Sequence, residues 1–469
     1  MSGRHGFRRV VVANRGEIAA RVIRTCRRLG IETVLTVSDA DAGSPPARLA
    51  DKTIRIGPAP AAASYLDADA IVSAAVAAGA DAIHPGYGFL SENARLARAC
   101  AAAGVVFIGP APETLEATGD KLAAREHAVA AGLPVLPGRH VLPDAGAGEV
   151  AAAIGFPVLV KAAGGGGGRG LRVVRDPGEL EHAVAVASAE AEAAFGDARV
   201  YLERYVSPAR HVEVQLLGDG ERVVHLGTRD CSVQRRYQKL IEEAPAPLLG
   251  DDLRGRLHAA AVAIGDHLRY RGAGTVEFLV DPEREEFYFL EVNARIQVEH
   301  PVTEAITGLD LVEEQIAIAE GRPLRVRQDA VTFAGHAIEC RVNAEDPRHD
   351  FLPSPGTVTR AVFPSPPAVR VDTHIQAGAT VPPHYDSLLA KVIAHGDGRG
   401  DALATLRGAL DRCAVDGVIT NLDMHRGLLA DPEFGKGGVD TRYLERWLAR
   451  EGTLADGMES AAYVLDDHE

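Results

Sequence analysis

The sequence predicts a mixed α/β and α+β fold built from three successive units and a short tail. Strand and helix patterns alternate from residue 8 to 120, strand patterns dominate from 121 to about 320, and strands with a following helix return from 325 to 450. A chain of 469 residues, 46% of them hydrophobic, can bury the cores of about two to four such units.

The first unit is expected to hold a doubly wound parallel sheet. Strands are predicted at residues 9–13, 33–37, 80–84 and 105–108, with helices at 16–29, 70–78 and 93–103. Such alternation is typical of parallel sheets. The dinucleotide fingerprint G-x-G-x-x-G does not follow the first strand, where Asn14-Arg15-Gly16-Glu17 stands instead, so a nicotinamide-dependent dehydrogenase is not favoured.

The two later units are predicted mainly from apolar strand patterns. In the middle unit, strands are expected at 157–162, 171–174, 200–205, 211–217 and 223–228, then a helix at 253–268 and a strand at 274–280. In the last unit, strands are expected at 336–343, 357–361, 369–373 and 390–394, followed by a helix at 399–413. Two prolines, Pro143 and Pro157, and the stretch 144–148 predict a hinge into a mobile subdomain.

Charge and cysteine content narrow the functional classes. The net charge of −15 argues against nucleic acid or an anionic membrane as the main partner. The five cysteines form no C-x-x-C pair and are scattered, which disfavours a zinc site or a disulfide framework and suits a reducing compartment. No apolar run has the length of a membrane span or follows a signal-peptide pattern, so we expect a cytoplasmic protein.

Lysine is rare in this chain, which uses arginine for most of its 50 basic residues. The lysines are Lys52, Lys121, Lys161, Lys239, Lys391 and Lys436. A retained lysine marks a candidate position for a compact ammonium on a flexible stem. For Lys52 and Lys436 the favoured interpretation is an ordinary solvated surface charge.

A glycine run follows a strand pattern that ends at Lys161. Residues 164–168 are all glycine, and Arg169 and Gly170 follow. Glycine allows backbone N–H groups to approach an anion closely, and no G-K-[ST] of a Walker A motif is present. Because strand patterns flank the run on both sides, we expect a flap over a phosphate rather than a flexible linker.

The strongest pattern lies at residues 287–300. Polar residues alternate with apolar ones here, and the polar set is Glu291, Asn293, Arg295, Gln297 and Glu299. If the segment is extended, these five side chains share one face. An amphipathic edge strand also alternates, but its solvated face rarely combines carboxylates, a guanidinium and amides.

A preceding strand supplies a second carboxylate. A hairpin centred at Arg284 would pair Val280 with Tyr288 and place Glu277 opposite Glu291, with Cβ atoms about 5 Å apart. Carboxylates at that spacing repel unless a cation lies between them. The oxygens of Glu277, Glu291 and Asn293 suit Mg²⁺ or Mn²⁺, which would hold ATP phosphates.

Two further motifs are weaker when taken alone. Residues 230–243 concentrate cations, with Lys239 close to Arg235 and Arg236, although a solvated basic turn has the same composition. Residues 84–93 combine a proline, two glycines and polar groups after a predicted strand. Ligands tend to bind at that edge of a parallel sheet.

Together these motifs resemble the biotin carboxylases of the ATP-grasp superfamily. The matching stretches are residues 13–18, 84–93, 119–121, 161–170, 229–247, 271–278, 291–303, 339–346 and 351–356, and the likeness covers residues 6 to 450. The resemblance implies an N-terminal biotin carboxylase domain (1–120), an ATP-grasp domain (121–322) with a mobile lid at about 138–206, a C-terminal biotin carboxylase domain (323–455) and a tail (456–469).

The resemblance also implies residue roles. The ATP contacts would be Lys121, Lys161, Gly167, Gly168, Glu203, Arg204, Tyr205, Val206, His211, Gln234, Tyr237, Glu277 and Glu291. Two Mg²⁺ or Mn²⁺ ions would bind Glu277, Glu291 and Asn293, and bicarbonate would bind Lys239, Arg295, Gln297 and Val298. Glu299 would be the base, Arg341 would stabilise the biotin enolate and Tyr87 would lie near the ureido ring. The catalytic set is therefore Lys239, Arg295, Glu299 and Arg341.

The implied activity is carboxylation of biotin N1 by ATP and bicarbonate through carboxyphosphate, the first half-reaction of acetyl-CoA or another acyl-CoA carboxylase. The partners would be a biotin carboxyl carrier protein, carboxyltransferase subunits and a second copy of the chain. Three alternatives are open: the corresponding subunit of a two-subunit pyruvate or other carboxylase, another ATP-grasp ligase that forms an acyl phosphate, such as a carboxyaminoimidazole ribonucleotide synthase, or a non-catalytic nucleotide-binding subunit.

Two departures from the family pattern affect these expectations. Tyr237 stands where many members have histidine, which puts one hydrogen bond to ATP in doubt. No Met-Lys-Met biotin-attachment motif occurs, and neither Lys391, between Ala390 and Val392, nor Lys436, between two glycines, is a credible acceptor. We therefore expect biotin to arrive on another chain.

Overall fold

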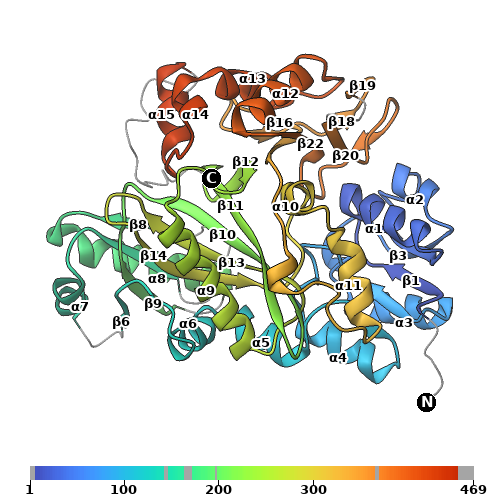
Figure 1. The fold of residues 1–469 in the computed structure, drawn as a ribbon, viewed down its shortest axis with the longest axis horizontal. Helices are drawn as coiled ribbons and strands as arrows, with labels where there is room; N and C mark the ends of the chain where they lie inside the picture. The colour runs from blue at the N-terminus through green and yellow to red at the C-terminus, as the bar shows by residue number, and fades with distance from the viewer. Residues whose placement is uncertain (1–5, 142–145, 163–171, 196–197, 365–368, 453–469) are drawn as a thin grey trace.

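The computed structural model describes residues 6–141, 146–162, 172–195, 198–364 and 369–452. The N-terminal elements lie on one side, the segment from β6 to β9 on the opposite side, and the C-terminal elements above both (Figure 1). This arrangement confirms the predicted α/β and α+β fold. The glycine run, including Gly167 and Gly168, lies outside the described residues, as does the predicted tail at 456–469.

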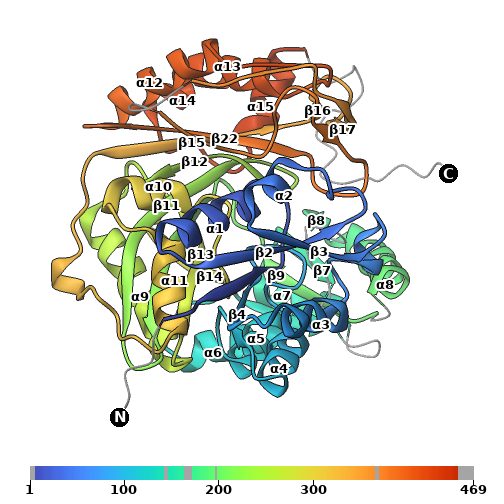
Figure 2. The same cartoon turned by 90° about the vertical axis from the view of Figure 1, so that its right-hand side faces the viewer.

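The N-terminal region contains the predicted parallel sheet, which lies at the front of the molecule in Figure 2. Its strands are β1 (Arg9–Val12), β2 (Glu32–Ser38), β3 (Lys52–Gly57), β4 (Ala82–His84) and β5 (Val106–Phe107), in the order β3-β2-β1-β4-β5. The helices are α1 (Gly16–Arg28), α2 (Pro45–Leu49), α3 (Ala68–Ala78), α4 (Ala94–Ala102), α5 (Pro112–Gly119) and α6 (Lys121–Ala130). The sequence did not predict β3, because the strand has no continuous apolar run. Its first four residues are partly or fully exposed in the structure.

A large antiparallel sheet forms the centre of the molecule. Its strands are β10 (Arg210–Asp219), β11 (Val223–Arg235), β12 (Gln238–Ala244), β13 (Arg271–Asp281), β14 (Glu286–Asn293), β15 (His336–Asn343), β20 (Val369–Thr373) and β22 (Leu388–Gly396). Their order is β14-β13-β10-β11-β12-β15-β22-β20. Pairing of β12 with β15 makes the sheet continuous across the domain boundary predicted at residue 322.

The segment predicted as a lid has a sheet and a core of its own. It comprises β6 (Gly138–Val141), α7 (Ala147–Ile154), β7 (Val158–Ala162), β8 (Arg172–Val174), α8 (Leu180–Phe195) and β9 (Val200–Arg204), with the strand order β6-β9-β7-β8. Its buried residues, among them Ile154, Val160 and Leu202, form a separate hydrophobic cluster. Separate packing is consistent with movement as a unit.

Helices cover the large sheet. They are α9 (Asp251–His267), α10 (His300–Thr307), α11 (Leu311–Ala319), α12 (Arg399–Asp411), α13 (Leu422–Ala430), α14 (Pro432–Lys436) and α15 (Tyr443–Arg450). Short strands complete the C-terminal region: β16 (Glu345–Asp346), β17 (Leu352–Pro353), β18 (Gly356–Thr357), β19 (Arg360–Val362), β21 (Thr380–Val381) and β23 (Ala414–Asp416). The strand predicted at 357–361 is thus divided between β18 and β19. None of the helices described here is long and apolar enough to cross a membrane.

The structure confirms one part of the predicted hairpin and corrects another. Glu277 is opposite Glu291, as predicted. Val280, however, pairs with Phe287 instead of Tyr288, because the register shifts by one residue next to Glu277. The predicted register near the turn was therefore wrong, and a β-bulge in β14 restores it at the carboxylates.

The condition for a shared face, an extended segment as far as Glu299, is not met. β14 ends at Asn293, and residues 294–299 form an irregular segment that leads into α10. Pro301 at the start of α10 favours a helix beginning here because its fixed φ suits the first helical turn. The alternating polar residues therefore converge through a turn rather than along one strand face.

The core beside this hairpin can be tested at Phe278. This side chain is fully buried and packs edge-on against Phe287, with ring centroids 5.4 Å apart. We expect Phe278→Ala to lower the free energy of unfolding by about 3–5 kcal/mol because it leaves a cavity. Urea denaturation measures this change. The exposed Leu352→Ala is the control, and an equal shift in the two variants would contradict the packing described here.

Candidate active site

Lys239 lies at the centre of a cluster of buried carboxylates. Its Nζ donates to Glu213 Oε2 at 2.6 Å, Glu277 Oε1 at 2.7 Å and Glu299 Oε1 at 2.8 Å. The three acceptors come from β10, β13 and the turn before α10. An ammonium has three donors, so every one of them is used.

Register explains why these groups meet. Glu213 of β10 is directly opposite Glu277 of β13, and Glu277 is opposite Glu291 of β14. On the other side, Glu213 is opposite Arg229 of β11. The sheet thus carries a row of four charged residues across four neighbouring strands, and Lys239 reaches this row from β12.

Glu277, Glu291 and Asn293 form one corner of the cluster. The Asn293 amide nitrogen lies 3.0 Å from Glu277 Oε1 and 3.4 Å from Glu291 Oε1, so both carboxylates point toward the same space. Burial and the charge of Glu277 raise the pKa of Glu291, although Lys121 and Lys239 oppose this effect. The charge of Glu291 is only partly compensated, and its carboxylate faces that of Glu277 next to an amide, so these oxygens fit a divalent cation.

Arg295 and Gln297 extend the cluster toward the N-terminal region. Arg295 donates from Nη2 to Asn293 Oδ1, from Nη1 to Gln297 Oε1 and from Nε to Glu92 Oε2, each at 2.9 Å. Gln297 Nε2 lies 3.3 Å from Glu277 Oε1. Glu92 belongs to the motif at 84–93 and also accepts from the Ala294 backbone N–H at 2.8 Å. The turn after β14 is therefore fixed by a residue of the N-terminal region.

Arg341 contacts the cluster from β15. Its Nε donates to Glu242 Oε1 at 2.5 Å and its Nη2 to Glu299 Oε2 at 2.9 Å. Glu299 is thus held between Lys239 and Arg341, one cation on each oxygen. The guanidinium side chain remains 15% exposed, enough to meet a ligand.

The electrostatics of Glu299 follow from these contacts. Burial disfavours its charged form, but Lys239, Arg341 and Arg229 outweigh burial and hold the pKa of Glu299 well below its ordinary value. Conversely, burial disfavours the ammonium of Lys239, yet the surrounding carboxylates raise its pKa well above the ordinary value. The resting site therefore holds Glu299 as an ionised carboxylate.

His211 and the predicted ATP contacts surround this centre. His211 Nε2 of β10 lies 2.8 Å from Glu277 Oε2, and the attraction of Glu277 raises its pKa although burial opposes the charge. On the lid, Lys161 of β7 forms an ion pair with Glu203 of β9. Lys121 begins α6, whose first turn is capped by the Asp120 carboxylate.

The remaining predicted residues lie on β9, on β11 and in the segments that follow these two strands. Arg204 ends β9, and Tyr205 and Val206 follow it directly. Gln234 lies near the end of β11, where it is opposite Lys239, and Tyr237 lies 45% exposed in the turn that follows. Among the described residues, no hydrogen bond or ion pair joins Arg204, Tyr205 or Val206 to the carboxylate cluster.

Tyr87 and Val298 are joined through Glu17 and Lys391. Tyr87 donates its hydroxyl hydrogen to Glu17 Oε1. Lys391 Nζ lies 3.1 Å from the same oxygen and donates to the Val298 carbonyl at 2.8 Å. Lys391 is fully buried. It thus connects the predicted biotin and bicarbonate contacts.

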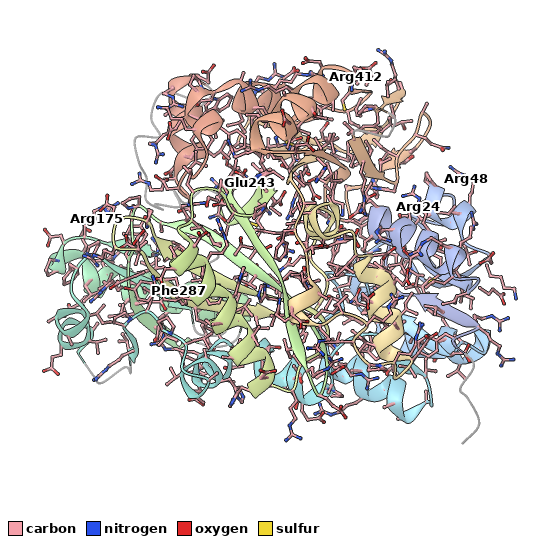
Figure 3. All side chains as sticks on the ribbon, viewed as in Figure 1. Arg24, Arg48, Arg175, Glu243, Phe287 and Arg412 are labelled. Carbon is pink, nitrogen blue, oxygen red and sulfur yellow. The ribbon has the colours of Figure 1, made fainter. Side chains whose placement is uncertain are left out.

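Sequence reasoning missed five other residues that shape the site: Glu17, Glu92, Glu213, Arg229 and Glu242. Arg229 is fully buried and donates to Glu213 and Thr303. Glu213 could have been found, because it is two residues from His211 on one strand and so shares its face. Glu242 and its neighbour Glu243 (labelled in Figure 3) point to opposite faces of β12, and Glu243 pairs with His336 and Arg399.

Models of three domain families match successive parts of the chain. They are described as Biotin carboxylase, N-terminal domain (residues 6–115), Carbamoyl-phosphate synthase L chain, ATP binding domain (120–327), and Biotin carboxylase C-terminal domain (339–446). The curated biotin carboxylase of Pseudomonas aeruginosa is 50% identical over 447 residues, which cover 94% of this chain and 99% of that protein.

Two solved structures are also similar. The biotin carboxylase–β,γ-ATP complex from Campylobacter jejuni has a TM-score of 0.89 and 44% identity, covering 94% of this chain and 99% of that one. The biotin carboxylase domain dimer of Hydrogenobacter thermophilus 2-oxoglutarate carboxylase, with MgADP, ADP and bicarbonate, has a TM-score of 0.90 and 43% identity, covering 96% and 99%. The extent of these similarities shows that the chain belongs to the biotin carboxylase family.

Proposed function

We propose that this protein uses ATP and bicarbonate to carboxylate N1 of biotin carried by a separate biotin carboxyl carrier protein. The observation that carries this proposal is Glu299, an ionised carboxylate held between Lys239 and Arg341. A base between two cations suits an anionic substrate that must lose a proton. The bicarbonate and nucleotide bound by family members support the same assignment.

In the first step, bicarbonate would bind against Lys239, Arg295, Gln297 and the Val298 backbone. Glu299 would accept its proton, an oxygen of the resulting carbonate would attack the γ-phosphorus of ATP, and the bond to ADP would break, giving carboxyphosphate. Proton uptake would remove the negative charge between Lys239 and Arg341, leaving both cations to neutralise the reacting oxygens. Catalysis here depends on positioning and preorganised charge.

The corner formed by Glu277, Glu291 and Asn293 would hold two Mg²⁺ or Mn²⁺ ions, whose charge would neutralise the ATP phosphates during transfer. Only the amide oxygen of Asn293 can bind a metal ion, and it now accepts from Arg295. The residues of the lid, with Lys161, Glu203 and Lys121, would contact the nucleotide. Lid closure over ATP would exclude water from the labile intermediate.

In the second step, carboxyphosphate would release CO₂ and phosphate in place. The phosphate would take the proton from biotin N1, and N1 would then form its bond to CO₂. Arg341, beside Tyr87, would stabilise the negative charge on the ureido oxygen. Its orientation is set by Glu242, which keeps the guanidinium next to the base.

We further propose a homodimer, as the domain from Hydrogenobacter thermophilus forms, and the domain division 1–120, 121–322 and 323–455. A cytoplasmic location and the role of the first half-reaction of an acyl-CoA carboxylase are part of this proposal. The subunit of a pyruvate or other carboxylase is the alternative, since a methylcrotonoyl-CoA carboxylase subunit and the biotin carboxylase subunit of a pyruvate carboxylase are both similar to this chain.

The roles of Glu299 and Arg341 predict a large loss of activity. We expect Glu299→Gln and Arg341→Ala each to lower kcat for bicarbonate- and biotin-dependent ATP cleavage by about 10²-fold or more, because proton transfer and charge stabilisation are lost. ATP binding should remain, as neither side chain is assigned to the nucleotide.

The matched control is Arg327→Ala, which removes a guanidinium whose ion-pair partner among the described residues is the exposed Asp329. It should retain the parent rate. Full activity in Glu299→Gln would show that the base is misassigned, and ATP cleavage that ignores biotin would favour another ATP-grasp ligase.

The divalent-ion corner predicts an effect that does not require turnover. Mg²⁺ added with ATP should raise the melting temperature more than ATP with EDTA, because a ligand that binds only the folded state stabilises it. We expect Glu291→Gln to lose this Mg²⁺-dependent increment. The control Glu286→Gln changes an exposed carboxylate of the same strand and should keep it. An unchanged increment in Glu291→Gln would contradict the assignment.

The identity of the partners can be tested by affinity capture with this chain. We expect a biotinylated carrier protein and carboxyltransferase subunits, identified by mass spectrometry, and turnover when the purified carrier replaces free biotin. Capture of a carboxyltransferase specific for an acyl-CoA supports the proposed role. Capture of a carboxyltransferase specific for pyruvate would support the alternative instead.

A further inference from the structure

Glu339 on β15 is a buried carboxyl group that the proposed reaction does not use. The residue has no exposed surface, and neither carboxyl oxygen has a hydrogen-bond partner among the described residues. Buried carboxylates are normally paired or hydrogen-bonded, because removing the charge from water is costly. An unpartnered carboxyl two residues from Arg341 therefore requires an explanation.

A second buried carboxyl lies directly across the sheet. The register of β12 and β15 places Glu242 opposite Glu339, and both residues are fully buried. Directly opposed residues on antiparallel strands have Cβ atoms about 4.5–5.5 Å apart. At that spacing, away from water, two like charges repel strongly, so both groups cannot readily ionise together.

The nearby cations already have other partners. Arg341 divides its contacts between Glu242 and Glu299. Lys391 of β22 contacts the Val298 carbonyl and Glu17, with Asp372 at 3.9 Å. Within the described parts of the chain, no cation forms an ion pair with Glu339.

Helix α10 packs over this part of the sheet and adds two titratable groups. His300 Nδ1 lies 2.8 Å from the Gln297 carbonyl, and burial lowers the pKa of His300 well below its ordinary value. Glu304 pairs with Arg21 and Arg370. Neither group supplies positive charge to Glu339.

We propose that Glu339 is a neutral carboxylic acid at neutral pH, that it carries the proton of the opposed Glu242–Glu339 pair while Glu242 stays ionised, and that this pair positions Arg341 for the reaction. The positioning role rests on the proposed function, whereas the protonation follows from the packing alone. Glu339 is a positioning residue, since it acts through Arg341.

The electrostatics agree with this distribution of the proton. Burial raises the pKa of Glu339 well above its ordinary value; the charge of Lys391 opposes this shift and that of Glu242 adds to it. Burial also raises the pKa of Glu242, to about 7, although Arg341 opposes the shift. The proton therefore resides mainly on Glu339, and Glu242 keeps the charge that orients Arg341.

A neutral Glu339 limits the negative charge around Arg341. The guanidinium then faces Glu242 and Glu299 but no third carboxylate. Once Glu299 has accepted the proton of bicarbonate, only Glu242 still competes for the guanidinium, which is free to face the ureido oxygen of biotin. An ionised Glu339 would add a third carboxylate that competes with biotin for Arg341.

Infrared spectroscopy of the whole protein tests the protonation directly. We expect wild type at neutral pH to show the C=O stretch of a protonated carboxylic acid, and Glu339→Gln to lose it. Glu243→Gln is the matched control, because Glu243 is the next residue of β12 but is paired with cations, and it should keep the band. Absence of the band, or its loss only in Glu242→Gln, would overturn the proposal.

Stability against pH gives a second measurement. A carboxyl whose pKa is higher in the folded protein than in the unfolded chain stabilises the fold fully below the unfolded pKa and loses this contribution as pH rises. As pH rises above about 4.5, wild type should therefore lose stability relative to Glu339→Gln. The melting temperature of wild type minus that of Glu339→Gln should become steadily more negative over this range. A difference that does not change with pH would contradict a protonated Glu339.

The positioning role is tested by pH–rate profiles of biotin-dependent ATP cleavage. The alkaline limb should move to higher pH in Glu339→Gln, and Glu242→Gln should lower kcat about tenfold with little change in the KM for ATP, because Arg341 loses its orienting carboxylate. An unshifted limb would refute positioning. If the infrared and stability results hold but ATP cleavage does not depend on biotin, the proposed function fails and the carboxyl pair stands.

Discussion

The contact on which the site depends is the ammonium of Lys239 shared by Glu213, Glu277 and Glu299. Each carboxylate is buried, and each comes from a different segment of the chain. Without the ammonium, three negative charges would face one another in a medium of low dielectric constant. Removing one partner of such a buried network is strongly destabilising, because the remaining charges lose their compensation. Lys239 therefore fixes the position of the base and the shape of the site together.

The large sheet makes this arrangement achievable, because its register decides which charges meet. One row of opposed residues runs from Glu291 through Glu277 and Glu213 to Arg229, and another pairs Glu242 with Glu339. The first row is short of positive charge at its outer end, where a divalent ion fits. The second row is short of positive charge too, but it lies beneath the surface, where a proton can compensate for the deficit.

Sequence patterns predicted the architecture and part of the site. Periodicity identified most strands, and the facing of Glu277 and Glu291 followed from hairpin symmetry. The same reasoning failed for Val280, because a bulge leaves no signal in an alternating pattern. It failed again beyond Asn293, where the turn depends on contacts with Glu92, a residue about 200 positions away in the chain. Glu242 and Glu339 could not be paired, because no local pattern encodes the pairing of β12 with β15.

The structure explains why two of the few lysines are not replaced by arginine. Lys52 and Lys436 are exposed, consistent with ordinary surface charges, whereas Lys239 and Lys391 each join segments that are distant in sequence. Lys391 is fully buried, so it could not accept biotin, yet its ammonium bonds a backbone carbonyl and a carboxylate at once. A guanidinium is planar and wider, and its fork geometry would not match such a compact set of acceptors. At Lys239 and Lys391, therefore, the geometry of the acceptors, and not charge alone, favours lysine over arginine.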